Sequence, residues 1–125
     1  MKLSEAPLIA FLATGEADEC KEFYVDKLGF KLLGETPLAL EFNAGGTMLR
    51  IQKVDDFEPQ GFTALGWRVT DIQKYVASLT AKGVRFKRYD DFGQDDAGIW
   101  TSPTGTKVAW FEDPDGNLLS LAEIA

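Results

Sequence analysis

The chain has 125 residues, with 13 lysines and arginines against 20 aspartates and glutamates, and its formal net charge is −7 at neutral pH. It contains no histidine and one cysteine, which excludes catalytic triads that use imidazole, zinc sites built on histidine pairs, and disulfide frameworks within one chain. The acidic balance disfavours binding to nucleic acid, because neutralising a phosphate backbone requires clustered lysine and arginine.

Length and a hydrophobic content of 45% predict a single globular domain, residues 1–125. No apolar run approaches the roughly 18 residues of a membrane-spanning helix. The first residues also lack the apolar stretch of a signal peptide. We therefore expect a cytoplasmic protein with no membrane partner.

The first half of the chain predicts a strand, a helix, a further strand and a hairpin. An apolar segment at 7–13 predicts the first strand, and Gly29 ends a helical pattern before a strand that begins at Phe30. The helix has apolar residues at helical spacing: Ala17, Cys20, Phe23, Tyr24 and Leu28. Residues 40–51 predict a hairpin that turns at 44–46.

The second half repeats this order. Residues 62–69 predict a strand, and Thr70 with Gln73 has the spacing of a helix capping box. Gly83 predicts the helix end, and Val84 the start of a strand. Residues 109–121 predict a hairpin, because Asp113-Pro114-Asp115-Gly116 has the chemistry of a tight turn.

The repeat divides the domain into module one (1–54), a polar linker (55–61) and module two (62–125). Two copies of one unit imply an approximate internal two-fold axis, with half-sheets facing each other around a cleft. Module two carries an insertion, 89–105, which contains four aspartates and three aromatic residues. Two interpretations of this insertion stay open: a lid over the cleft with Trp100 as its anchor, or a solvated acidic loop.

Two segments carry a family resemblance: FYVDKLGFKLL at 23–33 and VAWFEDPDGNLLSLAEI at 108–124. Together with the duplication they resemble the glyoxalase/bleomycin resistance/extradiol dioxygenase superfamily, also called the vicinal oxygen chelate (VOC) superfamily. The resemblance implies an α+β fold in which two βαβββ modules form an incomplete barrel around a cleft. In the enzymes of this family, the first and last strands of each module hold a divalent metal there.

Carried over by position, those metal-ligand sites fall on Ile9, Arg50, Ala64 and Ser120. An aliphatic side chain has no lone pair, a guanidinium only donates, and one hydroxyl is a weak ligand for a divalent cation. The residues directly beside these positions offer no carboxylate, imidazole or thiolate. We therefore expect no metal and no other cofactor.

Taking these positions as facing the cleft, strand alternation predicts the rest of its lining. The expected ligand-binding residues are Ile9, Phe11, Glu41, Met48, Arg50, Ala64, Arg68, Trp100, Trp110 and Ser120. Other roles stay open for some of them: Glu41 and Arg50 could pair with each other across neighbouring strands. Trp110 could be ordinary packing, and Arg68 could be solvated.

The favoured hypothesis is a protein without a metal site that binds or sequesters a small aromatic or cationic organic molecule, as the bleomycin resistance members of the family do. The resemblance also implies a homodimer. The alternative is a lyase, isomerase or dioxygenase that uses Glu41 as a general base, or an atypical metal site. A plain interaction domain is a third possibility. Whether the chain is an enzyme stays open, and the residues at the expected metal-ligand positions favour a protein that only binds its ligand.

Overall fold

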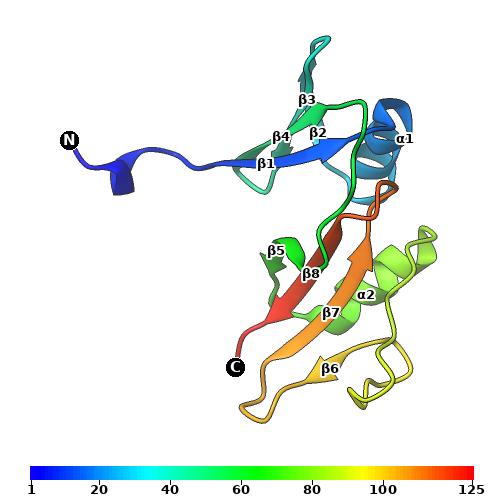
Figure 1. Ribbon diagram of the computed structural model, residues 1–125. Coiled ribbons are helices and arrows are strands. Elements are labelled where there is room, and N and C mark those ends of the chain that lie inside the picture. The colour runs from blue at the N-terminus through cyan, green and yellow to red at the C-terminus, as the bar shows by residue number, and fades with distance from the viewer. The chain divides into compact units, whose positions relative to one another are not determined.

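The computed structural model describes all 125 residues. The chain divides into two compact units, Met1–Glu58 and Pro59–Ala125, and each holds one open four-stranded sheet (Figure 1). The predicted α+β fold class is confirmed, because each sheet mixes parallel and antiparallel strands and each unit carries helical segments. No helix of the chain combines the length and apolar character needed to cross a membrane.

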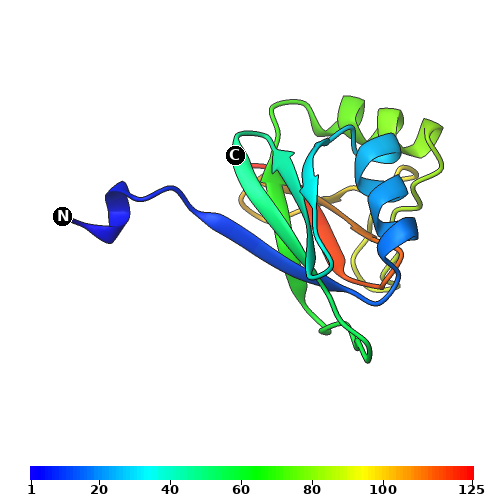
Figure 2. The ribbon, with the colours of Figure 1, turned by 90° about the horizontal axis from the view of Figure 1, so that it is seen from above.

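The first unit begins with a short helical turn, and in Figure 2 its N-terminal segment extends away from the sheet. The strand order is β1-β4-β3-β2, in which β1 runs parallel to β4 and the other pairs are antiparallel. The elements are η1 (Leu3–Glu5), β1 (Ile9–Thr14), α1 (Ala17–Glu22), a π-helical turn η2 (Phe23–Lys27), β2 (Lys31–Glu35), β3 (Ala39–Ala44) and β4 (Thr47–Lys53).

The helical segment of the first unit covers one face of its sheet and buries Tyr24 completely. The Tyr24 ring lies 5.3 Å from that of Phe23 in a T-shaped arrangement and 5.6 Å from that of Phe42 in β3. Alternate strand residues turn toward this core, where Leu49 and Ile51 of β4 are almost fully buried. No helix packs on the opposite face of this sheet. That face carries the strand residues that alternate with the buried ones.

An ion-pair cluster ties α1 to the sheet. Lys21 of α1 contacts Glu35 of β2 at 2.5 Å, and Lys53 of β4 contacts the same carboxylate at 2.8 Å. The hydrogen bonds from Lys21 and Lys53 lower the pKa of Glu35 to about 2. The first of these bonds also raises the pKa of Lys21. Glu35 is consequently held in its charged form.

The second unit has the strand order β5-β8-β7-β6, with β5 parallel to β8. Its elements are β5 (Thr63–Arg68), α2 (Ile72–Ala81), β6 (Trp100–Thr101), β7 (Lys107–Glu112) and β8 (Leu118–Glu123). Ile72 and Val76 of α2 are buried against the sheet. The Asp113 carboxylate accepts hydrogen bonds from the amides of Asp115 and Asn117 at 3.0 and 2.9 Å, which confirms the predicted turn.

Two local predictions for this unit are wrong. Val84 begins no strand: only Phe86 forms an isolated bridge, to Phe111, and the fourth strand is β6, inside the predicted insertion. The helix cap is Asp71 rather than Thr70, because the Asp71 carboxylate accepts from the amide of Lys74 at 3.3 Å. Asp71 itself has the non-helical backbone of a cap, so the helix begins one residue later than the capping box predicts.

Candidate functional site

Strand alternation gives the second unit one face packed on α2 and one open face. Ala109 and Phe111 of β7 are buried on the helix side, and Trp67 stacks on Phe111 there at 6.5 Å. Trp110 turns to the opposite side, where it pairs across the sheet with Ser120 of β8. The open face therefore carries a large aromatic side chain at its centre.

Four rings meet on this face, and we call them the aromatic cluster: Tyr89, Phe92, Trp100 and Trp110. Trp110 lies 5.5 Å from Tyr89 and 5.6 Å from Phe92, both in T-shaped arrangements, and 6.0 Å from Trp100. Phe92 also lies 5.7 Å from Trp100 and 5.1 Å from Tyr89. These separations are typical of favourable edge-to-face and offset ring pairs.

The aromatic cluster is only partly covered by the protein. Phe92 is 45% exposed, and the other three rings are half-buried. Ring faces that remain in contact with water can stack on a planar ligand, and the negative charge of a π face attracts cations. The cluster can therefore hold a flat organic molecule, with or without positive charge.

Beside the cluster, the open face is lined by small residues. Ser120 pairs with Gly66 of β5, and a Cβ atom at Gly66 would stand 2.8 Å from the Ser120 Oγ. The lack of a side chain at Gly66 is thus what leaves room for the Ser120 hydroxyl. Ala64 is exposed where the register of β5 and β8 shifts, and Arg68 is exposed at the end of β5.

The first unit also presents an open sheet face, with apolar and charged residues. Ile9 and Phe11 of β1 are 47% and 52% exposed, and β4 places Met48 and Arg50 opposite them in register. Arg50 Nη1 donates to Oε2 of Glu41, which lies directly opposite Arg50 in the neighbouring strand β3. The two side chains are 29% and 27% exposed, so this pair contributes little stability but engages the Glu41 carboxylate.

The four residues expected at metal-ligand positions do not have the chemistry to hold a divalent cation. Ile9 and Arg50 lie on the open face of the first sheet, and Ala64 and Ser120 on β5 and β8 of the second. Together they offer one hydroxyl oxygen and a positive guanidinium. Nowhere in the chain do three or more acidic or cysteine side chains gather in a group that could hold a metal ion.

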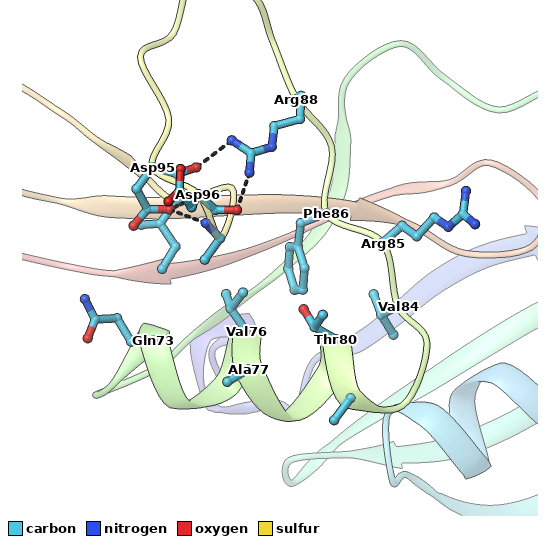
Figure 3. A pocket seen from close by; sticks show the side chains of 13 residues that line it. Gln73, Val76, Ala77, Thr80, Val84, Arg85, Phe86, Arg88, Asp95 and Asp96 are labelled. Atoms are coloured by element: carbon cyan, nitrogen blue, oxygen red, sulfur yellow. Dashed lines mark hydrogen bonds between the residues drawn. The ribbon is translucent and has the colours of Figure 1, made fainter.

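A groove of about 830 Å³ lies on the other side of the second unit, between α2 and residues 84–99 (Figure 3). Val76 and Phe86 contribute apolar surface to it. Arg88 at its rim donates to the backbone carbonyls of Asp95, at 2.5 Å, and Asp96. The Asp95 carboxylate accepts from the amides of Ala97 and Ile99, both at 2.9 Å. The acidic residues here therefore shape the loop.

Sequence reasoning missed part of this arrangement. It named Trp100 and Trp110 but not Tyr89 and Phe92, which complete the aromatic cluster. The signal was present, since both lie in the aromatic-rich insertion. It also missed Gln94, whose side chain bonds only to backbone groups of the loop; nothing in its sequence context marks it.

Comparison with known proteins places this geometry in a family. The sequence matches the Glyoxalase/Bleomycin resistance protein/Dioxygenase superfamily over residues 8–121. No curated protein matched. Similar solved structures include TnmS3, described as an antibiotic binding protein from Streptomyces sp. CB03234, at 25% identity and a TM-score of 0.74, with 100% of both chains covered.

Two others bear the family name. A glyoxalase family protein from Enterococcus faecalis is 25% identical, with a TM-score of 0.73 and 98% of this chain and 100% of that chain covered. A glyoxalase/bleomycin resistance protein/dioxygenase from Alicyclobacillus acidocaldarius is 21% identical, with a TM-score of 0.74 and coverage of 99% and 95%. The chain therefore belongs to the Glyoxalase/Bleomycin resistance protein/Dioxygenase superfamily.

Proposed function

We propose that this protein binds a small aromatic or cationic organic molecule on the open face of its second sheet and holds it without chemical change. The observation that carries the proposal is the aromatic cluster, in which four rings lie within 6.0 Å of a neighbour and keep exposed surface. A few aromatic surfaces with sparse polar groups are typical of sites for organic ligands. The net charge of −7 favours cations through long-range steering.

The likeness to TnmS3 supports the same function. That protein is described as antibiotic-binding, and it matches this chain over its entire length at 25% identity. By analogy, we propose that this chain also captures a drug-like or metabolite-like molecule. The open face of the first unit, with Phe11, Met48 and the Glu41–Arg50 pair, is a second apolar and charged surface that could by itself take an organic molecule.

The alternative, a lyase, isomerase or dioxygenase of the same superfamily, has less support. A general base must be able to accept a proton from the substrate, but the Glu41 carboxylate is engaged by Arg50. A metal-dependent enzyme would need ligands that Ile9, Arg50, Ala64 and Ser120 do not offer. No other acidic cluster of the chain replaces them.

We further propose that the protein acts as a homodimer in the cytoplasm. β1 is an edge strand of its sheet. It carries the exposed apolar side chains of Ile9 and Phe11, and Leu8, directly before the strand, is exposed as well. Such an edge is covered in most proteins. Sedimentation velocity should give a dimer, and Phe11→Lys should yield monomers; a monomeric wild type contradicts this part.

The ligand itself can be found by a thermal-shift screen of antibiotics, aromatic metabolites and aromatic cations. A ligand at about 100 times its Kd stabilises the folded state by roughly 2.7 kcal/mol, which raises Tm by several degrees. After incubation with the protein, the mass of the released ligand, measured by mass spectrometry, should be unchanged. A screen that yields no stabilising compound, or a ligand that is converted during incubation, would contradict the proposed function.

A further inference from the structure

Residues 87–99 form an irregular loop that supplies two of the four rings of the aromatic cluster. The loop starts where the Lys87 amide donates to the Trp110 carbonyl at 2.7 Å, and it ends at Trp100 in β6. Its first turn is closed by the Phe92 amide, which donates to the Tyr89 carbonyl at 3.0 Å. The positions of Tyr89 and Phe92 thus depend on how this loop is held.

Gln94 lies between the first turn and a second turn at 95–98, and its side chain joins three parts of the loop. Its Oε1 accepts from the Tyr89 amide at 2.7 Å. Its Nε2 donates to the Lys87 carbonyl at 2.9 Å and to the Gly98 carbonyl at 2.7 Å. Both amide protons and one acceptor position of the side chain are therefore used, all on backbone groups.

The other side-chain bonds within the loop do not reach the aromatic turn. The Asp95 carboxylate binds the amides of Ala97 and Ile99, and Arg88 binds the carbonyls of Asp95 and Asp96, as Figure 3 shows. Both sets of bonds shape the second turn. Arg88 thus ties its own side chain to the second turn, whereas the Gln94 side chain bonds directly to the backbone of Tyr89 and of Lys87, next to the sheet.

We propose that Gln94 is the positioning residue of the ligand site: its amide holds Tyr89 and Phe92 against Trp110 and Trp100 before the ligand arrives. The inference rests on the proposed function and deepens it. Ordering a loop costs conformational entropy. A loop that is already ordered spares the ligand that cost, so binding is stronger than to a loop that must fold around it.

The test compares wild type with Gln94→Ala and Gln94→Glu, using 9-aminoacridine, a flat aromatic cation, as the fluorescent probe. Gln94→Ala removes all three bonds, whereas Gln94→Glu keeps the acceptor for the Tyr89 amide and loses both donors. Gln73→Ala is the matched control, because Gln73 is exposed on α2. If only about a tenth of the molecules hold the loop in its binding-competent conformation, the apparent Kd rises roughly tenfold. We expect that result for Gln94→Ala, at least as large a rise for Gln94→Glu, whose carboxylate would face the Lys87 and Gly98 carbonyl oxygens, and none for Gln73→Ala.

Hydrogen exchange separates positioning from a general loss of stability. In Gln94→Ala the Phe92 amide should exchange faster than in wild type without probe and regain its protection when 9-aminoacridine saturates the site. A lower Tm with unchanged Kd and unchanged Phe92 exchange would overturn the inference while leaving the proposed function standing. If wild type itself does not bind 9-aminoacridine, binding of aromatic cations at this site is refuted, and the role of Gln94 in it is refuted as well.

Discussion

Replacing Trp110 by alanine removes the residue that touches all three other rings of the aromatic cluster. Trp110 meets Tyr89 and Phe92 edge to face at 5.5 and 5.6 Å and Trp100 at 6.0 Å. It stands on the open face of the sheet, so its loss leaves the core between the sheet and α2 intact. The substitution therefore tests the site more than the fold.

The size of the effect follows from these contacts. Each ring pair contributes roughly 0.5–1.5 kcal/mol beyond buried area, so the three pairs of Trp110 predict a loss of about 1.5–4.5 kcal/mol in the free energy of unfolding. This is smaller than the roughly 5–15 kcal/mol of an ordinary domain, so the variant stays folded. Losing one stacking surface should weaken ligand binding by about 1–2 kcal/mol, or roughly 5- to 30-fold in Kd.

Urea denaturation measures the first quantity and titration with 9-aminoacridine the second. Trp110→Phe should restore part of the affinity because it keeps a ring. Trp67→Ala is the matched control: Trp67 stacks on Phe111 at 6.5 Å on the helix side of the same sheet, so this change should lower stability and leave Kd unaltered. The reasoning is refuted if Trp110→Ala binds the probe as wild type does, or if Trp67→Ala weakens binding equally.

Three further predictions concern the framework of the site. Gly66→Ala places a Cβ 2.8 Å from the Ser120 Oγ and should cost about 1–3 kcal/mol in urea unfolding; the double variant with Ser120→Ala should recover most of it, and additive losses would disprove the clash. Glu35, whose pKa its two lysine partners lower from 4.5 to about 2, contributes stability that is complete above pH 4.5 and lost as the pH falls through 2. The difference in unfolding free energy between wild type and Glu35→Gln should therefore shrink from pH 5 to pH 2, and a difference independent of pH would count against the pairing. Asp71→Ala should destabilise the protein by about 1 kcal/mol, because the Lys74 amide loses its cap, whereas Thr70→Ala should not. If thermal denaturation showed a larger loss of Tm for Thr70→Ala than for Asp71→Ala, Thr70 would be the cap.

What the sequence predicted well depends on geometry that repeats along the chain. Strand alternation and the internal duplication are enough to bring Glu41 opposite Arg50 and Trp110 opposite Ser120, as observed. The glycine that ends the second helix is found with a φ of 94° at Gly83. These features follow from local rules that distant contacts did not override.

The remaining features depend on contacts between distant residues. Val84 and its neighbours have strand-like composition, but the edge of the sheet is occupied by β6, only two residues long, from inside the insertion. The three bonds of Gln94 exist only once the loop is folded, and a glutamine in a polar loop has no periodicity that would single it out. Sequence therefore predicted the sheet faces and the aromatic-rich insertion, but not how the folded loop and the Gln94 side chain arrange Tyr89 and Phe92 in the aromatic cluster.

Metal content is the most direct test of the central claim, that this member of the superfamily holds an organic ligand with aromatic and apolar side chains and without a metal. Purified protein would be incubated with Zn²⁺, Ni²⁺, Fe²⁺ and Mn²⁺ in turn, dialysed, and assayed by elemental analysis. The account predicts far less than one ion per chain, because Ile9, Arg50, Ala64 and Ser120 cannot supply a ligand set. About one tightly held ion per chain would contradict it.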